Sequence, residues 1–170
     1  MHGKRVALVL GLIAAMPAWA QPGPPAAGLG LRICDFSSTF NAVAERQRLD
    51  LRAAGGCGRD IAIACDWRIG QGLAATGRVM GDQATLAEMA VTQAAVTTES
   101  TIELLAAFAV LIALLEPETA PEARRAAFHT LFPGSRVAPG QAAQARIGGT
   151  LFTLRRLPGD GFQLVAQRAG

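Results

Sequence analysis

The clearest pattern in the chain is a strict alternation of apolar residues with polar or small residues over residues 60–69. Such alternation is typical of a β-strand that has one face against a core. A Gly-Gln-Gly turn follows, and it predicts a second strand over residues 73–80 that pairs with the first as a hairpin. The apolar positions of the first strand are Ile61, Ile63, Cys65, Trp67 and Ile69, and the alternate positions are Asp60, Ala62, Ala64, Asp66 and Arg68.

Further segments extend this predicted sheet. Residues 85–96 fit a helix, through a capping-box spacing, or a third strand, and we favour the strand because two strands alone rarely form a stable sheet. Residues 146–156 and 162–168 predict a terminal hairpin around a Pro-Gly-Asp-Gly turn. A short strand over residues 49–53 is a further option.

Three segments have helical periodicity. Residues 35–48 place apolar side chains on one face, and residues 119–132 run from a Pro in the first turn to a Pro-Gly stop. Residues 100–116 form the clearest helix, in which the first residue and Glu103 have capping-box spacing. The apolar run 104–115 inside it covers about twelve residues, too few to cross a bilayer, and a helix that is apolar all round is typical of a buried central helix.

The order of these elements predicts an α+β fold: an antiparallel sheet of about four or five strands with about three helices packed on one face. The length of 170 residues suits a single domain, which we place at residues 32–170. Residues 21–31 are rich in Pro and Gly, so they are expected to form a flexible lead-in.

Residues 1–20 have the parts of a secretory signal peptide. Lys4 and Arg5 precede an apolar stretch at residues 6–16, and a small-x-small pattern predicts cleavage after Ala20. The apolar stretch would span only about 16 Å as a helix, so we expect no membrane span to remain after cleavage. The protein is therefore expected to be periplasmic or secreted, exported from a bacterial cytoplasm by a Sec-type signal.

The net charge of +3 belongs mostly to this segment. Lys4 is the only lysine, and its removal together with Arg5 leaves a net charge of about +1. A chain near neutrality, without a basic run, is not expected to bind nucleic acid. The absence of lysine from the rest of the chain also excludes lysine-based covalent chemistry.

The sequence has three cysteines, Cys34, Cys57 and Cys65. In an oxidising compartment they predict at least one disulfide. If the strand at residues 60–69 runs antiparallel beneath the helix at residues 35–48, Cys65 lies near the start of that helix. This geometry favours a Cys34–Cys65 disulfide. Cys57 is then an alternative partner or a free thiol.

The sequence carries few signs of catalysis. It contains no nucleophile elbow, P-loop or dinucleotide fingerprint, and we expect no metal site and no cofactor. His129, the histidine that remains after cleavage, is interpreted as a solvated helix residue. An enzyme is therefore the less favoured interpretation, and the remaining route to a hydrolase is a carboxylate pair in which Asp66 meets Asp82 or Glu88 across strands.

We expect an exported envelope protein that binds another protein or a peptide without catalysis. An alternative ligand is an apolar small molecule held between the sheet and the central helix, in a cavity on the order of several hundred Å³ beside Phe108 or Leu111. The partner and the oligomeric state are left open. The candidate docking face is the polar side of the first strand, formed by Asp60, Ala62, Ala64, Asp66 and Arg68.

Overall fold

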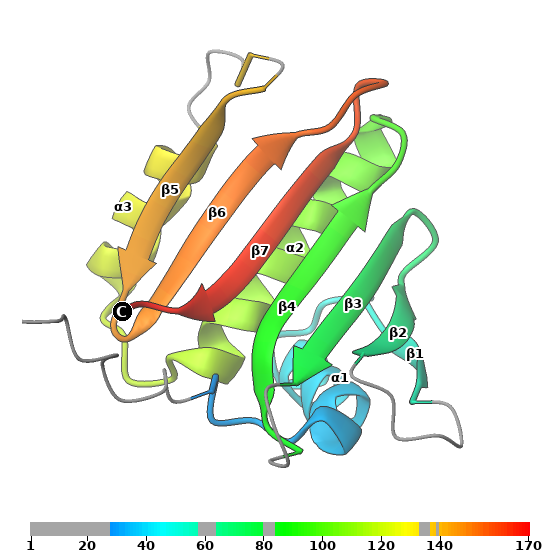
Figure 1. The fold of residues 1–170 in the computed structure, drawn as a ribbon, viewed down its shortest axis with the longest axis vertical. Helices are drawn as coiled ribbons and strands as arrows, with labels where there is room; N and C mark the ends of the chain where they lie inside the picture. The colour runs from blue at the N-terminus through cyan, green and yellow to red at the C-terminus, as the bar shows by residue number, and fades with distance from the viewer. Residues whose placement is uncertain (1–27, 58–63, 80–83, 133–136, 139) are drawn as a thin grey trace, which may run out of the picture.

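The computed structural model describes residues 28–57, 64–79, 84–132, 137–138 and 140–170. These residues form a seven-stranded antiparallel sheet with three α-helices (Figure 1), which confirms the α+β class. The predicted signal peptide lies outside the described residues. The elements in chain order are η1 (Ile33–Asp35), α1 (Phe36–Arg46), β1 (Ala53–Gly56), β2 (Ala64–Ile69), β3 (Leu73–Val79), β4 (Leu86–Gln93), α2 (Thr98–Leu115), α3 (Pro121–Leu131), β5 (Ala142–Ile147), β6 (Thr150–Arg156) and β7 (Phe162–Arg168).

The sheet consists of two meanders joined in its middle. Its strand order is β1-β2-β3-β4-β7-β6-β5, so β4 and β7 pair at the junction and β1 and β5 form the two edges (Figure 1). The register at the junction places Ala90 opposite Val165. The connection from β4 to β5 carries both α2 and α3. These two helices therefore take the chain from the centre of the sheet to one of its edges.

The sheet has seven strands, so the expected number of about four or five is too low. The predicted strand at residues 146–156 is in fact mostly β6, and β5 precedes it across a tight turn in which Ile147 pairs with Thr150. Gly148 and Gly149 make this turn, and Gly148 has φ +55°, a conformation that glycine adopts at little cost. The optional strand at residues 49–53 shares only its last residue with the observed edge strand β1. By contrast, β4 confirms that residues 85–96 contain a strand.

All three helices lie on one face of the sheet (Figure 1). Two aromatic groups show how they pack. Phe36 of α1 lies against Trp67 of β2, with ring centroids 4.6 Å apart. Phe108 of α2 meets Phe152 of β6 edge to face at 5.3 Å. These four rings are buried and belong to one continuous core, so the predicted packing of helices on one face matches the structure.

The end of the predicted lead-in is part of the domain. Leu29 is buried, and its N–H donates to the Leu86 carbonyl at 2.6 Å. The Leu86 N–H in turn donates to the Leu31 carbonyl at 2.8 Å. The chain therefore joins the fold just before residue 32, alongside the start of β4.

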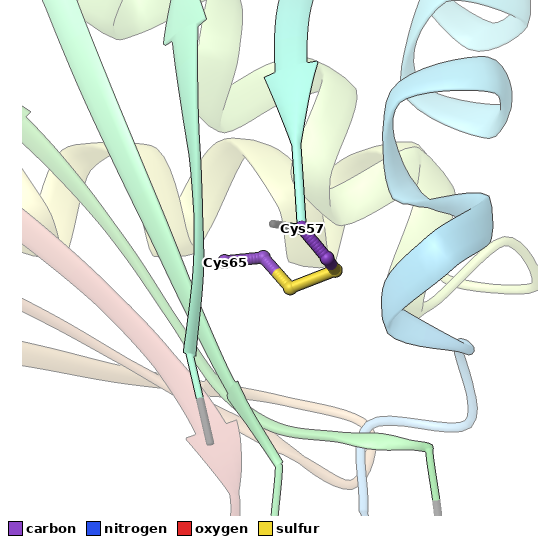
Figure 2. Close-up of a disulfide and its surroundings, with 2 residues drawn as sticks. All are labelled: Cys57 and Cys65. Carbon is purple, nitrogen blue, oxygen red and sulfur yellow. A yellow bond between two sulfur atoms is a disulfide. The ribbon is translucent and has the colours of Figure 1, made fainter. Parts of the chain in front are cut away.

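The disulfide joins Cys57 to Cys65, with Cα atoms 4.4 Å apart (Figure 2). Cys34 is a free, exposed cysteine. The preferred Cys34–Cys65 pairing is therefore wrong, and the alternative partner Cys57 is the one found. The reason is the register of β1 with β2, which pairs Gly56 with Asp66 and so brings the next residue, Cys57, alongside Cys65. Figure 2 shows the bond between the two strands on the side that faces α1.

Candidate functional site

Helix α2 is apolar on the side that faces away from the sheet as well as on the side that faces it. Its inner side chains, such as Leu104 and Leu111, are buried, whereas Ile102 is 61% exposed. The 18 residues of α2 have a mean hydropathy of 1.8, so the helix is long and apolar enough to cross a membrane, a property that the core helices of soluble proteins share. Of this span, 39% is buried. We name the apolar residues on the outer side of α2 the outer stripe: Ile102, Leu105, Ala106, Ala109 and Ala113. Ile102 and Ala109 are exposed, whereas Leu105, Ala106 and Ala113 are partly buried.

A groove of about 300 Å³ runs beside the outer stripe, between α2 and α3. The rings of Phe108 and Phe128, with centroids 6.4 Å apart, lie between the two helices. Phe108 also contacts Phe132, just after α3, at 5.6 Å. The complete lining is Gln47, Leu105, Phe108, Ala109, Ile112, Arg124, Arg125 and Phe128.

Two carboxylates hold α2 against the sheet. Glu103 accepts hydrogen bonds from the backbone N–H groups of Gln71 and Gly72, at 2.9 and 2.8 Å, in the turn between β2 and β3. Glu116 accepts from the Gly149 N–H at 2.9 Å and from the Thr150 hydroxyl at 2.7 Å, in the turn between β5 and β6. Because both anchors bind the helix to the sheet, the orientation of its outer stripe is fixed.

The capping box that begins α2 differs from the expected one. Thr97 is the N-cap, and its hydroxyl accepts from the Ser100 N–H at 3.1 Å while the Ser100 hydroxyl accepts from the Thr97 N–H at 3.0 Å. Glu103, expected to complete a box with Ser100, serves instead as the anchor to the turn after β2. The helix therefore begins slightly earlier than residue 100.

Two arginines of α3 border the groove. Arg124 donates from Nε to the Thr119 carbonyl at 2.9 Å and from Nη2 to the Pro117 carbonyl at 2.7 Å. These bonds fix its guanidinium group and leave three of about five N–H donors for another acceptor. Arg125 is exposed. Within the described part of the chain, neither arginine forms a salt bridge, and no Asp or Glu lines the groove.

The predicted docking face lies on the opposite side of the molecule. Ala64, Asp66 and Arg68 of β2 are on the sheet face that the helices leave open, whereas Asp60 and Ala62 lie outside the described residues. Thr76 donates to Asp66 at 2.7 Å, which occupies part of that carboxylate. The alternation therefore predicted which side of β2 is exposed, and docking on that side stays a prediction.

Polar side chains across this open face bind one another. Gln163 donates to the Thr92 hydroxyl at 3.1 Å, and Arg155 donates through Nε to the Gln163 side-chain oxygen at 2.7 Å. Farther along the sheet, Gln144 donates to the Thr153 hydroxyl at 3.3 Å. Several polar side chains of the open face are thus hydrogen-bonded to neighbours on adjacent strands.

The two described members of the carboxylate pair considered for catalysis, Asp66 and Glu88, do not meet. Asp66 and Glu88 are two strands apart, and the strand between them places Arg78 opposite Glu88, so their Cα atoms lie about 12 Å from each other by sheet spacing. Asp82 lies outside the described residues. His129 is exposed on α3. The described residues contain no group of three or more His, Cys, Asp or Glu side chains that could hold a metal ion.

Besides the groove, the surface has a polar pocket at the connection between α1 and β1. It measures about 280 Å³, and its lining mixes carboxylates with arginines. Asn41 stabilises the wall nearby, because its side chain accepts from the Ala53 N–H at 2.7 Å and donates to the Ala53 carbonyl at 3.1 Å. The charges of this pocket can balance one another. The lining is Asn41, Glu45, Arg48, Leu49, Asp50, Leu51 and Arg52.

The groove between α2 and α3 was not predicted from the sequence. The cavity predicted for an apolar ligand lies between the sheet and α2, beside Phe108 or Leu111. The groove instead lies on the side of α2 that faces away from the sheet, and no strand residue lines it. The uninterrupted apolar run of α2 was the signal that could have indicated the groove, since a helix in a single layer has one uncovered side.

Comparisons of the chain with family models, with curated proteins and with solved structures find no match.

Proposed function

We propose that this protein is an exported, non-enzymatic binding domain that holds an apolar segment of another protein in the groove between α2 and α3. The observation that carries the proposal is the outer stripe of α2, which stays partly exposed although α1 and α3 pack on the same face of the sheet. A helix that only needed to cover the sheet would be polar on its outer side. Contiguous apolar surface on a soluble domain is typical of an interaction site.

The extent of this surface favours a chain segment over a small molecule. The outer stripe runs from Ile102 to Ala113, about 16 Å along the helix. The groove beside it is open rather than enclosed between sheet and helix, and all of its lining comes from helices or their ends. Small-molecule sites usually bury most of their ligand. An elongated apolar partner fits the stripe and the groove together.

The open sheet face is the rival docking surface, and two features make it the weaker candidate. Its polar side chains hydrogen-bond one another, as Thr76 does with Asp66 and Gln163 with Thr92. Its central position Ala90 is small and 9% exposed. A partner there would have to replace contacts that already exist, whereas a partner in the groove would cover apolar surface that is now in water.

Two features support the proposed export. Residues 1–20 have the arrangement of a signal peptide. The disulfide between Cys57 and Cys65 is compatible with an oxidising compartment such as the periplasm. Fusing residues 1–20 to a reporter enzyme that is active only after export tests this part of the proposal, and a reporter retained in the cytoplasm would contradict it.

A selection from a random peptide library displayed on phage tests the binding site. We expect enriched peptides to bind the wild-type protein at least about tenfold more tightly than the Ala109→Glu variant, because a carboxylate in the outer stripe would be desolvated by an apolar partner. Ala74→Glu is the matched control, since Ala74 is also exposed but lies on the open sheet face. Peptides that bind both variants equally well, or no enrichment at all, would refute the groove as the site.

A further inference from the structure

The charges at the border of the groove give the chemistry of its partner. We propose that the occupant is an amphipathic helix of a partner protein, about three turns long, whose apolar side contacts the outer stripe and whose carboxylates pair with Arg124 and Arg125. This inference rests on the proposed function and specifies the partner's class. Helix-in-groove recognition uses apolar anchors at helical spacing, flanked by charges that set orientation and specificity.

The first argument is charge complementarity. Two guanidinium groups border the groove and no carboxylate lines it. Glu122 lies one turn before Arg125 on α3, yet the two form no salt bridge in the described part of the chain. An acidic partner would therefore gain ion pairs there, whereas a basic partner would meet like charge.

The second argument is preorganisation. Arg124 is held by the Thr119 and Pro117 carbonyls, so little side-chain entropy remains to be lost when an anion binds its free N–H groups. A guanidinium group can bind a carboxylate through two parallel hydrogen bonds. Arg124 is thus suited to a fixed carboxylate position, and the exposed Arg125 adds positive charge beside it.

The third argument is the shape of the apolar surface. Ala106, Ala109 and Ala113 follow one another at spacings of three and four residues, so their short side chains let another helix approach α2 closely. Ile102 and Leu105 provide larger apolar contacts near the first half of α2. A partner helix of about eleven residues would cover the full length of the stripe.

A second copy of this chain fits the groove less well. A two-fold symmetric contact brings the same patch together from both molecules, so each partner would supply arginines and no groove-lining carboxylate. Such a contact would leave Arg124 and Arg125 without acidic partners at the centre of the interface. A different protein with acidic residues is the occupant that the charges favour.

Three synthetic peptides of about 14 residues test this inference by fluorescence anisotropy. They share one apolar helical stripe and carry Glu, Gln or Lys at the flanking positions. We expect the Glu peptide to bind the wild-type protein at least about tenfold more tightly than the Lys peptide at low salt, with a smaller difference at high salt. Arg125→Glu should largely abolish the preference, because the new carboxylate offsets the charge of Arg124. Arg68→Glu, at an exposed arginine on the open sheet face, should leave it unchanged.

The outcomes separate the inference from the proposed function. Equal binding of all three peptides, with sensitivity to Ala109→Glu, would overturn the acidic partner and support a groove that binds apolar segments. No binding by any peptide would overturn both. A dimer in sedimentation equilibrium that Ala109→Glu dissociates would show that a second copy occupies the groove, which would also overturn both.

Discussion

Glu116 illustrates how a single residue fixes the orientation of α2 and its outer stripe. Its carboxylate is half-buried at the end of α2, where it accepts from Gly149 and Thr150 and lies 3.6 Å from the guanidinium group of Arg168. Thr150 is fully buried, so its hydroxyl depends on this one side chain for a hydrogen-bond acceptor. The residue therefore joins the helix, the β5–β6 turn and the last residue of β7.

Replacing Glu116 tests this anchor. Glu116→Ala should lower the free energy of unfolding by about 2 kcal/mol, because it leaves the buried Thr150 hydroxyl and the Gly149 N–H without their acceptor. Glu116→Gln keeps an acceptor oxygen and should lose less. Urea unfolding followed by circular dichroism measures both. Glu118→Ala, at an exposed neighbour, is the control, and an equal loss from it would contradict the anchor.

Among the elements, β1 has the least support from its own sequence. It is a four-residue edge strand, Ala-Ala-Gly-Gly, and it pairs with β2 alone. Asn41 of α1 binds the backbone of Ala53 at one end, and the disulfide closes the other end. Short, glycine-rich strands pack few side chains, so these two attachments account for much of its stability.

Removal of the disulfide should therefore be costly. Cys57→Ser should lower the free energy of unfolding by about 2–3 kcal/mol, the chain-entropy value for so short a loop. Cys34→Ser should change it by less than about 0.5 kcal/mol, because Cys34 is exposed and free. Thermal unfolding of the oxidised proteins compares the two variants. A larger loss from Cys34→Ser would favour the Cys34–Cys65 pairing.

The sequence predicted the helices and strands better than the pairing and packing between them. Local patterns were enough for β2, β3, β7 and the three helices, whereas β4 fitted a helix as well as a strand and was predicted from the need for a third strand in the sheet. The Gly148-Gly149 turn was missed since the apolar pattern continues on both sides of it. The disulfide depends on the register of β1 against β2, and that register is a long-range property. The groove depends on how far α3 lies from α2, which no local pattern specifies.

At the scale of the whole molecule, the two large surfaces differ in kind. The open sheet face carries mainly small and polar side chains, and several of them hydrogen-bond one another. The helical face carries the outer stripe and the groove, where Leu105 is only half-buried on the outside of a helix whose inner side is core. In a single layer of helices, one side of α2 thus belongs to the core, and the other side is the surface on which the proposed binding depends.

The adjacent residues Leu104 and Leu105 allow the contribution of α2 to folding to be tested separately from its proposed contribution to binding. Leu104 is 2% exposed in the core, so Leu104→Ala should lower the free energy of unfolding by about 2–5 kcal/mol through the cavity it creates. Leu105→Ala should cost about 1 kcal/mol or less and weaken peptide binding by at least about fivefold, because it removes apolar surface from the groove and not from the core. Calorimetry and anisotropy on the same two variants provide the comparison. If Leu105→Ala destabilised the protein as much as Leu104→Ala while peptide affinity stayed the same, the outer stripe would belong to the core and the binding function would have no surface.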